Sequence, residues 1–397
     1  MSDLIPQEAY NYFPSGEKLF IGSGRSIVRY IFYNTEFTQY ELSQLSEFKQ
    51  FLESSKVSIP DEISVEEVLR AIIGCKFNFK KTLEAIGSAI QWKQVNMPHG
   101  IDSLYRKAEI LLNSGSIYIH GRDHRYRPQI ILNAGKLDLD LYTSDDYCNL
   151  LCFTLEYCVR ELMVPGHIEN WIIITDLNHQ SLGSLPLSEL KAIIKTLQDN
   201  FRCRMIVNYI VNAPRSLKFI WTVIKQFIEP HTVNKIRILR EGKPAEMKQH
   251  FAPHQYEEKY GGTSPNLTTK FWPPTLPTGP FEAPGETPGA HLDYTKTAEF
   301  PIDHPEEIFY SFARSTIEFS STKPFQSFRK DTLESRNTVY SDAISRYTVY
   351  SDAVSTVHES SINPSHEPLL PNSSASPSPS PSPSPKPKKC CKGCSIF

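Results

Sequence analysis

The strongest constraint on the fold is an alternation of strand and helix patterns between residues 62 and 275. Short apolar runs typical of buried strands occur at 116–120, 129–132, 171–176, 205–211 and 235–239. Longer segments with apolar residues at helical spacing separate them, at 145–163, 187–200 and 216–228. Strands that are separated by helices predict an α/β sheet with right-handed crossovers and argue against an all-β barrel.

The regions on either side of this alternation differ from it in composition. Residues 1–60 contain one clear helical pattern, at 38–54, and two short helices are expected within 64–95. Beyond residue 275 the chain is rich in Pro, then in Ser and Thr, and then in Ser-Pro repeats, which cannot form a core. We therefore expect a helical extension (1–60), a helical subdomain (61–97), an α/β domain (98–275), a disordered tether (276–389) and a C-terminal segment (390–397).

Composition excludes several classes of function. The 397 residues, 40% of them apolar, are enough for one substantial core. The formal net charge of −2 gives no overall attraction to nucleic acid, so no such partner is expected. No apolar run reaches the ~18 residues that a membrane-spanning helix needs, and no signal peptide is visible. These features predict a protein made in the cytosol.

No motif of an enzyme or of a metal site is found. The chain lacks a nucleophile elbow, a phosphate-cradling glycine loop and an HExxH motif, so we expect neither catalysis nor a cofactor. Cys148 and Cys152 are four residues apart on an expected helix, a spacing that could hold a metal, but nothing nearby supplies further ligands. We interpret them as core thiols, and the acidic segment 138–146 as a solvated loop before a helix.

The expected helix at 217–228 is unusual because apolar residues surround most of its circumference. A helix that covers one face of a sheet needs only an apolar stripe. Two interpretations stay open: the helix is deeply buried, or it closes an apolar cavity on its other side.

Several segments together resemble the CRAL-TRIO family of lipid-binding proteins. They are VLRAIIGCKFNFKKTLEAIGSAIQWKQ (68–94), IYIHGRDHRYRPQIIL (117–132), WIIITDLNHQSLGSL (171–185), IVNAPRSLKFIWTVIKQFIEPHTVNKIRIL (210–239), EEKYGGT (257–263) and FWPP (271–274). The resemblance covers residues 60–275, and the order and spacing of the segments make it specific.

The resemblance implies an α/β fold: a mixed sheet flanked by helices encloses a hydrophobic cavity, and a small all-α subdomain precedes it. It implies a bound lipid and a mobile gate helix, for which we name Leu217, Trp221, Ile224 and Ile228. The expected cavity residues are Ile119, Ile130, Trp171, Ile173, Ile210, Ile220 and Phe227. Each methylene of a lipid that enters such a cavity is stabilised by about 0.8 kcal/mol.

For the lipid headgroup, the resemblance implies a phosphate site made by Thr232, Lys235 and Lys76. An Arg and a Glu of the family's phosphatidylinositol site are replaced here by Cys75 and Cys203. The family's positions that hold phosphatidylcholine are apolar here and fall on Ile119, Ile130, Trp171 and Ile173, which predicts a drier pocket. The alternatives are a strand lysine with its head in solvent at position 235 and a turn residue at position 232.

The chain ends in Cys-Ser-Ile-Phe, which fits the C-a-a-X pattern for prenylation of Cys394. Cys390 and Cys391 are candidates for palmitoylation, and the neighbouring lysines would face anionic headgroups. We therefore expect a lipid-anchored protein on the cytoplasmic face of a membrane, with a cytosolic pool. The alternatives are a coincidental cysteine-rich terminus and a metal site in the tail.

Two functions follow as hypotheses. The first is binding, and transfer or presentation, of a single phospholipid or other small hydrophobic ligand at a membrane surface, with a phosphoinositide as the expected class. The second is a membrane-recruited adaptor whose tail binds signalling partners. It draws on the repeats TVYSDAIS (338–345) and TVYSDAVS (348–355), for which a neutral duplication is the other interpretation.

Overall fold

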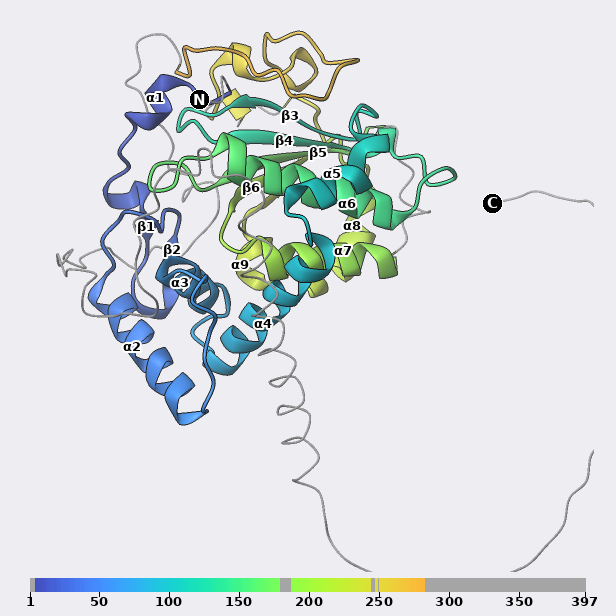
Figure 1. Cartoon of the computed structure of the whole chain (residues 1–397). Coiled ribbons are helices and arrows are strands. Elements are labelled where there is room, and N and C mark those ends of the chain that lie inside the picture. Colours follow the sequence, from blue (N-terminus) through green and yellow to red (C-terminus); the bar gives the residue numbers. More distant parts are fainter. Residues whose placement is uncertain (1–3, 179–186, 244–246, 249, 283–397) are drawn as a thin grey trace, which may run out of the picture. The chain divides into compact units, whose positions relative to one another are not determined.

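The computed structural model describes residues 4–178, 187–243, 247–248 and 250–282 (Figure 1). All of them belong to one compact unit, Met1–Ser345. A second unit, Arg346–Phe397, lies outside the described residues. Within the described part of the chain, no helix is both long and apolar enough to cross a membrane.

A mixed five-stranded sheet forms the centre of this unit, in the order β3-β4-β5-β6-β7 (Figure 1). The strands are β3 (Ile117–Arg122), β4 (Pro128–Asn133), β5 (Trp171–Asp176), β6 (Met205–Val211) and β7 (Ile236–Ile238). β3 runs antiparallel to β4, and all further neighbours are parallel. Parallel neighbours need crossover connections, which here are helices. The predicted α/β class and the predicted strands are thereby confirmed.

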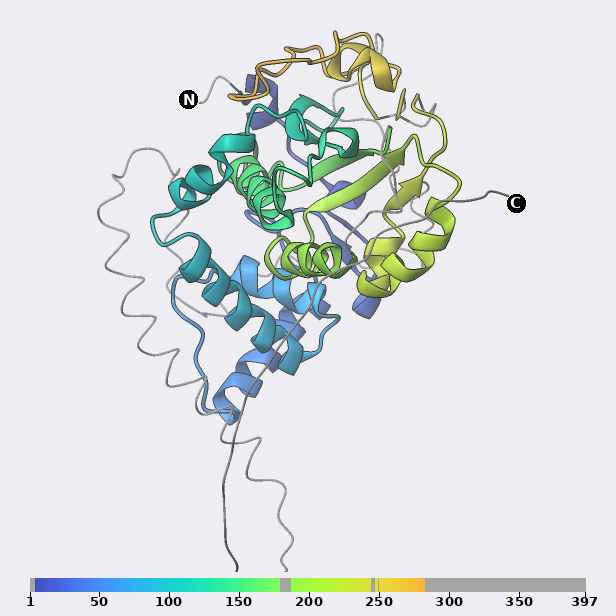
Figure 2. The ribbon, with the colours of Figure 1, turned by 90° about the vertical axis from the view of Figure 1, so that its right-hand side faces the viewer.

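The crossover helices lie on one face of this sheet. They are α6 (Ser144–Tyr157), α7 (Leu187–Asn200), α8 (Leu217–Ile224) and α9 (Pro230–Val233), preceded in the chain by α5 (Ile101–Ala108). α6 continues as a π-helical turn at Cys158–Leu162. It begins at a capping box in which the hydroxyl of Thr143 accepts a hydrogen bond from the amide of Asp146. In Figure 2, α7 lies between α6 and the α8–α9 segment.

The N-terminal part of the chain contributes α1 (Gln7–Tyr10), a two-stranded sheet and three longer helices. The strands are β1 (Phe20–Ile21) and β2 (Val28–Arg29), and the helices are α2 (Gln39–Ser54), α3 (Val65–Gly74) and α4 (Phe79–Asn96). Thr38 caps α2 in a second capping box, and Ser64 and Asn78 cap α3 and α4. The helices expected from sequence periodicity are present, and residues 1–60 also contain the small sheet.

The two faces of the central sheet belong to different cores, because successive side chains of a strand point to opposite faces. One core joins Tyr118, Ile131, Ile172, Ile174 and Tyr209 to α2, α3 and the segment after β7. The other core joins Ile119, Ile130, Trp171 and Ile173 to α5 and α6. A third, small cluster beside α8 contains Ala213 and Leu217 with the partly buried Ile210 and Ile220.

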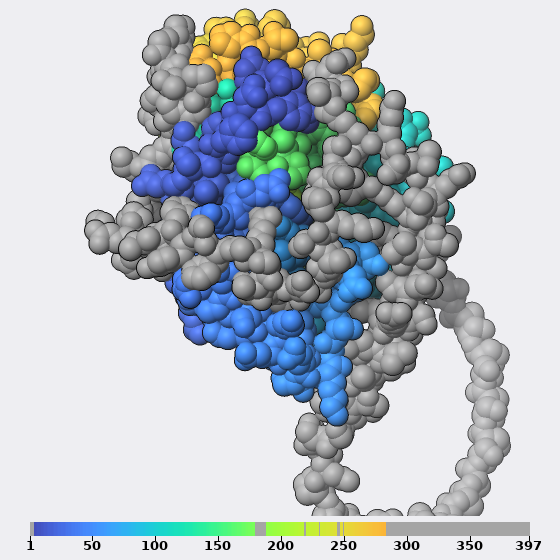
Figure 3. Space-filling model, turned by 60° about the vertical axis from the view of Figure 1, so that its left-hand side comes forward, coloured from blue at the N-terminus to red at the C-terminus, as the bar shows by residue number. Residues whose placement is uncertain are grey.

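A buried carboxylate connects the N-terminal region to the sheet. Glu169, just before β5, accepts hydrogen bonds from the backbone amides of Phe32 (3.1 Å), Tyr33 (2.8 Å) and Gly166 (3.0 Å). Its other partner is the guanidinium of Arg70 on α3, at 2.6 Å, and both side chains are almost completely buried. In Figure 3 the dark-blue N-terminal residues border a green part of the central region. This carboxylate therefore fixes the place of α3 relative to β5.

Candidate functional site

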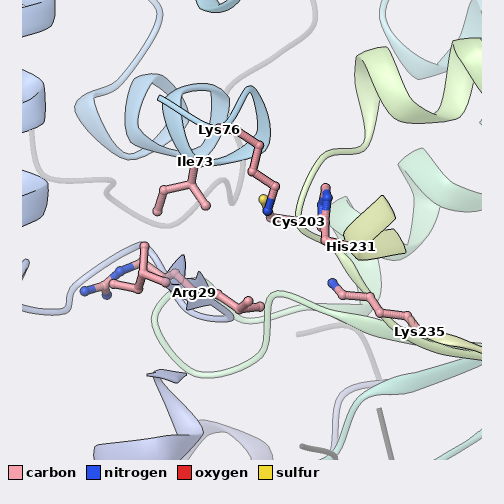
Figure 4. Close-up of a pocket in the computed structure, with 8 residues that line it drawn as sticks. Arg29, Ile73, Lys76, Cys203, His231 and Lys235 are labelled. Carbon is pink, nitrogen blue, oxygen red and sulfur yellow. The ribbon is translucent and has the colours of Figure 1, made fainter. Parts of the chain in front are cut away.

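A small pocket lies where the end of α3, the turn before β6 and the segment from α9 to β7 meet (Figure 4). Its lining residues are Ile27, Val28, Arg29, Ile73, Lys76, Cys203, His231 and Lys235. The pocket leaves about 10 Å³ for the centre of a water molecule, which is room for about one water. The cations in its wall make it the candidate site.

Lys235 supplies the most buried of these cations. It lies directly before β7 with 6% of its surface exposed, and its ammonium donates a hydrogen bond of 2.9 Å to the carbonyl of Met205. Burial lowers the pKa of Lys235, and the nearby charge of Lys76 lowers it further. No carboxylate pairs with this ammonium within the described part of the chain. An anion that entered the pocket would supply the missing partner.

Lys76 reaches the same pocket from the end of α3. It follows the last residues of the helix in a left-handed backbone conformation, φ 54°, which redirects the chain toward α4. In Figure 4 its side chain runs from the end of α3 toward Cys203, on the side of the pocket that faces His231. Lys76 is exposed and has no ion-pair partner among the described residues. Lys76 and Lys235 are therefore both cations without a compensating carboxylate.

The arginines near the pocket differ from these lysines because carboxylates already compensate them. The guanidinium of Arg29 lies 2.6 Å from Glu41 in a completely buried ion pair. Arg202 pairs with Asp199 at 3.2 Å and lies 3.5 Å from Glu229. The net positive charge of the pocket therefore comes from Lys76 and Lys235.

The predicted headgroup residues do not all enter the pocket. The structure brings Lys76 and Lys235 together, but Thr232 is not among the lining residues. The carbonyl of Thr232 instead accepts a hydrogen bond from the amide of Lys235 at 3.0 Å, so Thr232 shapes the turn that places the lysine. Cys203 lines the pocket, and Cys75 lies next to Lys76 in the chain. Sequence reasoning missed His231, although it adjoins Thr232 in the motif that carries the resemblance.

The expected gate helix is shorter than predicted. α8 ends at Ile224, a 3₁₀ turn covers Lys225–Phe227, and Ile228 is extended. The prediction of a continuous helix to Ile228 was wrong. Pro230 disfavours helical backbone at the residue before it, which interrupts the path into α9.

The exposure of α8 is uneven. Leu217 (5%) and Ile224 (9%) are buried, Trp221 is half-buried, and Val223 leaves 39% of its surface exposed. Polar side chains, Thr222 among them, are exposed beside Val223. The side chains of Lys218 and Phe219 lie outside the described part. α8 therefore covers the sheet with one side and presents a mixed surface on the other.

The expected cavity residues come from the helix-covered face of the sheet and from the α8 segment, and they have different surroundings. Ile119, Ile130, Trp171 and Ile173 are at most 8% exposed, and they pack in the core against α5 and α6. Ile210, Ile220 and Phe227 are half-buried beside α8 and α7. Ile238 of β7 leaves 39% of its surface exposed on the same face. A lipid-sized cavity stays a prediction, and the apolar residues beside α8 are the least buried of those expected to line it.

The lipidation sites Cys390, Cys391 and Cys394, the tether and its repeats lie outside the described residues. The same holds for residues 179–186, which connect β5 to α7. Those predictions therefore stay predictions.

Comparison with known proteins finds a family to which the central segment is similar. Residues 112–262 match the family model described as "CRAL/TRIO domain". This segment, which is less than half of the chain, is similar to that family. The matched segment includes the whole central sheet, α8 and the turn that carries Lys235. Lys76 lies outside it, on the helical region that precedes the domain.

Relatives of the CRAL/TRIO domain come from several kingdoms. The chain is 25% identical over 241 residues to the phosphatidylinositol/phosphatidylcholine transfer protein SFH4 of Arabidopsis thaliana. The alignment covers 56% of this chain and 39% of that protein. It is 26% identical over 219 residues to Clavesin-1 of Xenopus laevis, 53% of this chain and 64% of that protein. The match thus spans less than two thirds of these relatives' own length.

Among solved structures, the crystal structure of Sfh5 is similar to this chain. The aligned region covers 58% of this chain and 89% of the Sfh5 chain. The sequence identity is 14% and the TM-score is 0.45.

Proposed function

We propose that this protein binds a single phospholipid of the phosphatidylinositol class, with the headgroup phosphate held between Lys76 and Lys235. The observation that carries the proposal is the pair of uncompensated ammonium groups in one pocket. Support comes from the match to the CRAL/TRIO domain and from a relative whose name describes phosphatidylinositol and phosphatidylcholine transfer.

The charge of the pocket favours an anionic headgroup over a zwitterionic one. Hydrogen bonds between charged groups contribute about 1.5–3 kcal/mol each, and a phosphate can accept one from each lysine. The positive end of a choline headgroup would instead lie near two ammonium groups. In the proposal, the pocket therefore favours phosphatidylinositol over phosphatidylcholine.

In the proposal, the acyl chains lie along the helix-covered face of the sheet. Ile236 follows Lys235 in the chain, and Ile210 and Ile238 pair in register on this face. All three side chains are incompletely buried, so covering them with an acyl chain would lower the free energy by removing apolar surface from water. In the proposal, α8 and the 3₁₀ turn after it move to admit the chains, which bury Ile210, Ile220 and Phe227.

Mass spectrometry of lipids extracted from the purified full chain tests this proposal. We expect a phosphatidylinositol-class lipid at a stoichiometry near that of the protein. The Lys80→Met variant, which removes an exposed charge on α4 away from the pocket, serves as the control and should retain the lipid. A protein that carries no lipid, and takes none up from vesicles, contradicts the proposal and favours the adaptor function.

Membrane attachment through the C-terminal cysteines is a separate part of the proposal. A prenyl group at Cys394 with acyl groups at Cys390 and Cys391 would give the two signals that stable anchoring requires. We expect Cys394→Ser to move most of the protein from the membrane fraction to the supernatant, as measured by cell fractionation and immunoblotting. Ser376→Ala, in the Ser-Pro repeat, is the control. An unchanged membrane fraction for Cys394→Ser would rule out the anchor.

A further inference from the structure

An imidazole shares the pocket with the two lysines. His231 belongs to α9 and lines the pocket with Lys76 and Lys235 (Figure 4), and the charges of both lysines act on its ring. Only 20% of its side chain is exposed. Its Nδ1 lies 3.4 Å from a carboxylate oxygen of Glu229 and is buried without a hydrogen bond from the described residues. This nitrogen therefore lacks a hydrogen-bond partner within the described part of the chain.

Charged and titratable groups face His231 from every neighbouring element. α3 contributes Lys76, the turn between α7 and β6 contributes Arg202 and Cys203, the residue before β7 is Lys235, and Glu229 precedes α9. Three of these groups are cations and Glu229 is the carboxylate. Because Glu229 also lies near Arg202, at 3.5 Å, it offsets the cations only in part.

These surroundings keep the imidazole of His231 neutral. Burial, followed by the charges of Lys235, Lys76 and Arg202, lowers the pKa of His231 to about 3. The ring therefore carries no charge at pH 7. A phosphate between the lysines would reverse the sign of the local field, because an anion close to an imidazole favours its protonated form.

We propose that His231 takes up a proton from solvent when a lipid phosphate enters the pocket, so that the protein binds this lipid more tightly as the pH falls. The inference rests on the function proposed above. The proton goes to an imidazole nitrogen, no other bond changes, and the imidazolium adds a third positive charge next to the phosphate. His231 thus makes headgroup recognition dependent on pH.

The sign of the pH dependence follows from the linkage between proton uptake by His231 and lipid binding. Binding raises the pKa of His231, so the extra affinity is present below the pKa of the complex and is lost as the pH rises through it. If the pKa in the complex returns to the ordinary value near 6.5, affinity increases about tenfold between pH 7.5 and pH 5.5. At pH 5.5 the complex then takes up about one proton.

Calorimetric titration of the full chain tests the proposal. The probe is a short-chain phosphatidylinositol kept below its micelle-forming concentration, because its phosphodiester has the same charge throughout this pH range. Titrations at pH 5.5, 6.5 and 7.5, each in two buffers of different ionisation enthalpy, give both the affinity and the proton uptake. The matched variant is His231→Gln, which keeps a polar side chain but cannot titrate.

We expect the wild type to show the tenfold rise with proton uptake, and His231→Gln to bind with an affinity that does not depend on pH. Equal pH dependence in both proteins, or binding by the wild type without proton uptake, would overturn the role of His231 and leave the proposed function intact. The absence of binding at every pH would overturn both. The proton uptake of the wild type decides the question even if the variant does not fold.

Discussion

Replacing Glu169 by Ala is expected to lower the free energy of unfolding by about 3–5 kcal/mol, the loss typical when one partner of a buried ion pair is removed. The carboxylate accepts hydrogen bonds from the amides of Phe32, Tyr33 and Gly166, and it neutralises Arg70. After the replacement, Arg70 keeps only Glu67, at 3.3 Å, as a partner, and Glu67 is partly solvated. The buried guanidinium of Arg70 would then have only this one partner, and three backbone amides would lose their acceptor. Buried polar groups without partners destabilise the folded state.

Chemical denaturation followed by tryptophan fluorescence measures this loss. Glu84→Ala is the matched control because Glu84 is exposed on α4, and it should change stability by less than about 0.5 kcal/mol. Hydrogen exchange at Phe32 and Tyr33 should accelerate in Glu169→Ala but not in Glu84→Ala. A loss below about 1 kcal/mol for Glu169→Ala would show that this carboxylate does not join the N-terminal region to the sheet.

Much of the fold could be predicted because it depends on local pattern. Apolar runs such as 171–176 and 205–211 are rich in β-branched residues and bounded by polar turns, which identifies buried strands without any long-range information. The starts of two helices also have a local signal in the sequence. Thr38 and Ser64 stand directly before α2 and α3, and their hydroxyl groups cap these helices.

The end of α8 was predicted wrongly because apolar periodicity continues past the last helical residue. Phe227 and Ile228 fit the helical stripe, but Phe227 lies in a 3₁₀ turn and its ring is 5.0 Å from the ammonium of Lys191 on α7. This contact spans residues distant in the chain, so periodicity could not reveal it. The backbone requirement of Pro230 was the available signal.

The site was predicted in part for a similar reason. Residue pattern assigns Ile119 and Ile173 to one face of the sheet, but it does not say that α5 and α6 cover that end of the face while Ile210 stays partly open. Family resemblance pointed to Lys76 and Lys235, which the structure brings to one pocket, and their role at a headgroup stays a prediction. It did not point to His231, because the role proposed for this ring depends on lysines that come from two distant elements.

Replacing Lys235 by Met is expected to weaken phosphatidylinositol binding by about 10- to 100-fold, the equivalent of one charge-assisted hydrogen bond. The methionine preserves the apolar stem in its buried position, and only the bond to the carbonyl of Met205 is lost within the protein. Lys76→Met should have a smaller effect, because the exposed ammonium of Lys76 is screened by solvent and already hydrated.

The affinity of the full chain for short-chain phosphatidylinositol at pH 7, measured by calorimetry, tests the central claim most directly. Lys80→Met should match the wild type, Lys76→Met should be weaker, Lys235→Met weaker again, and the double variant Lys76→Met with Lys235→Met should show no detectable binding. Circular dichroism verifies that each variant is folded. A folded double variant that binds the lipid as tightly as the wild type would contradict the claim that this pocket holds the phosphate.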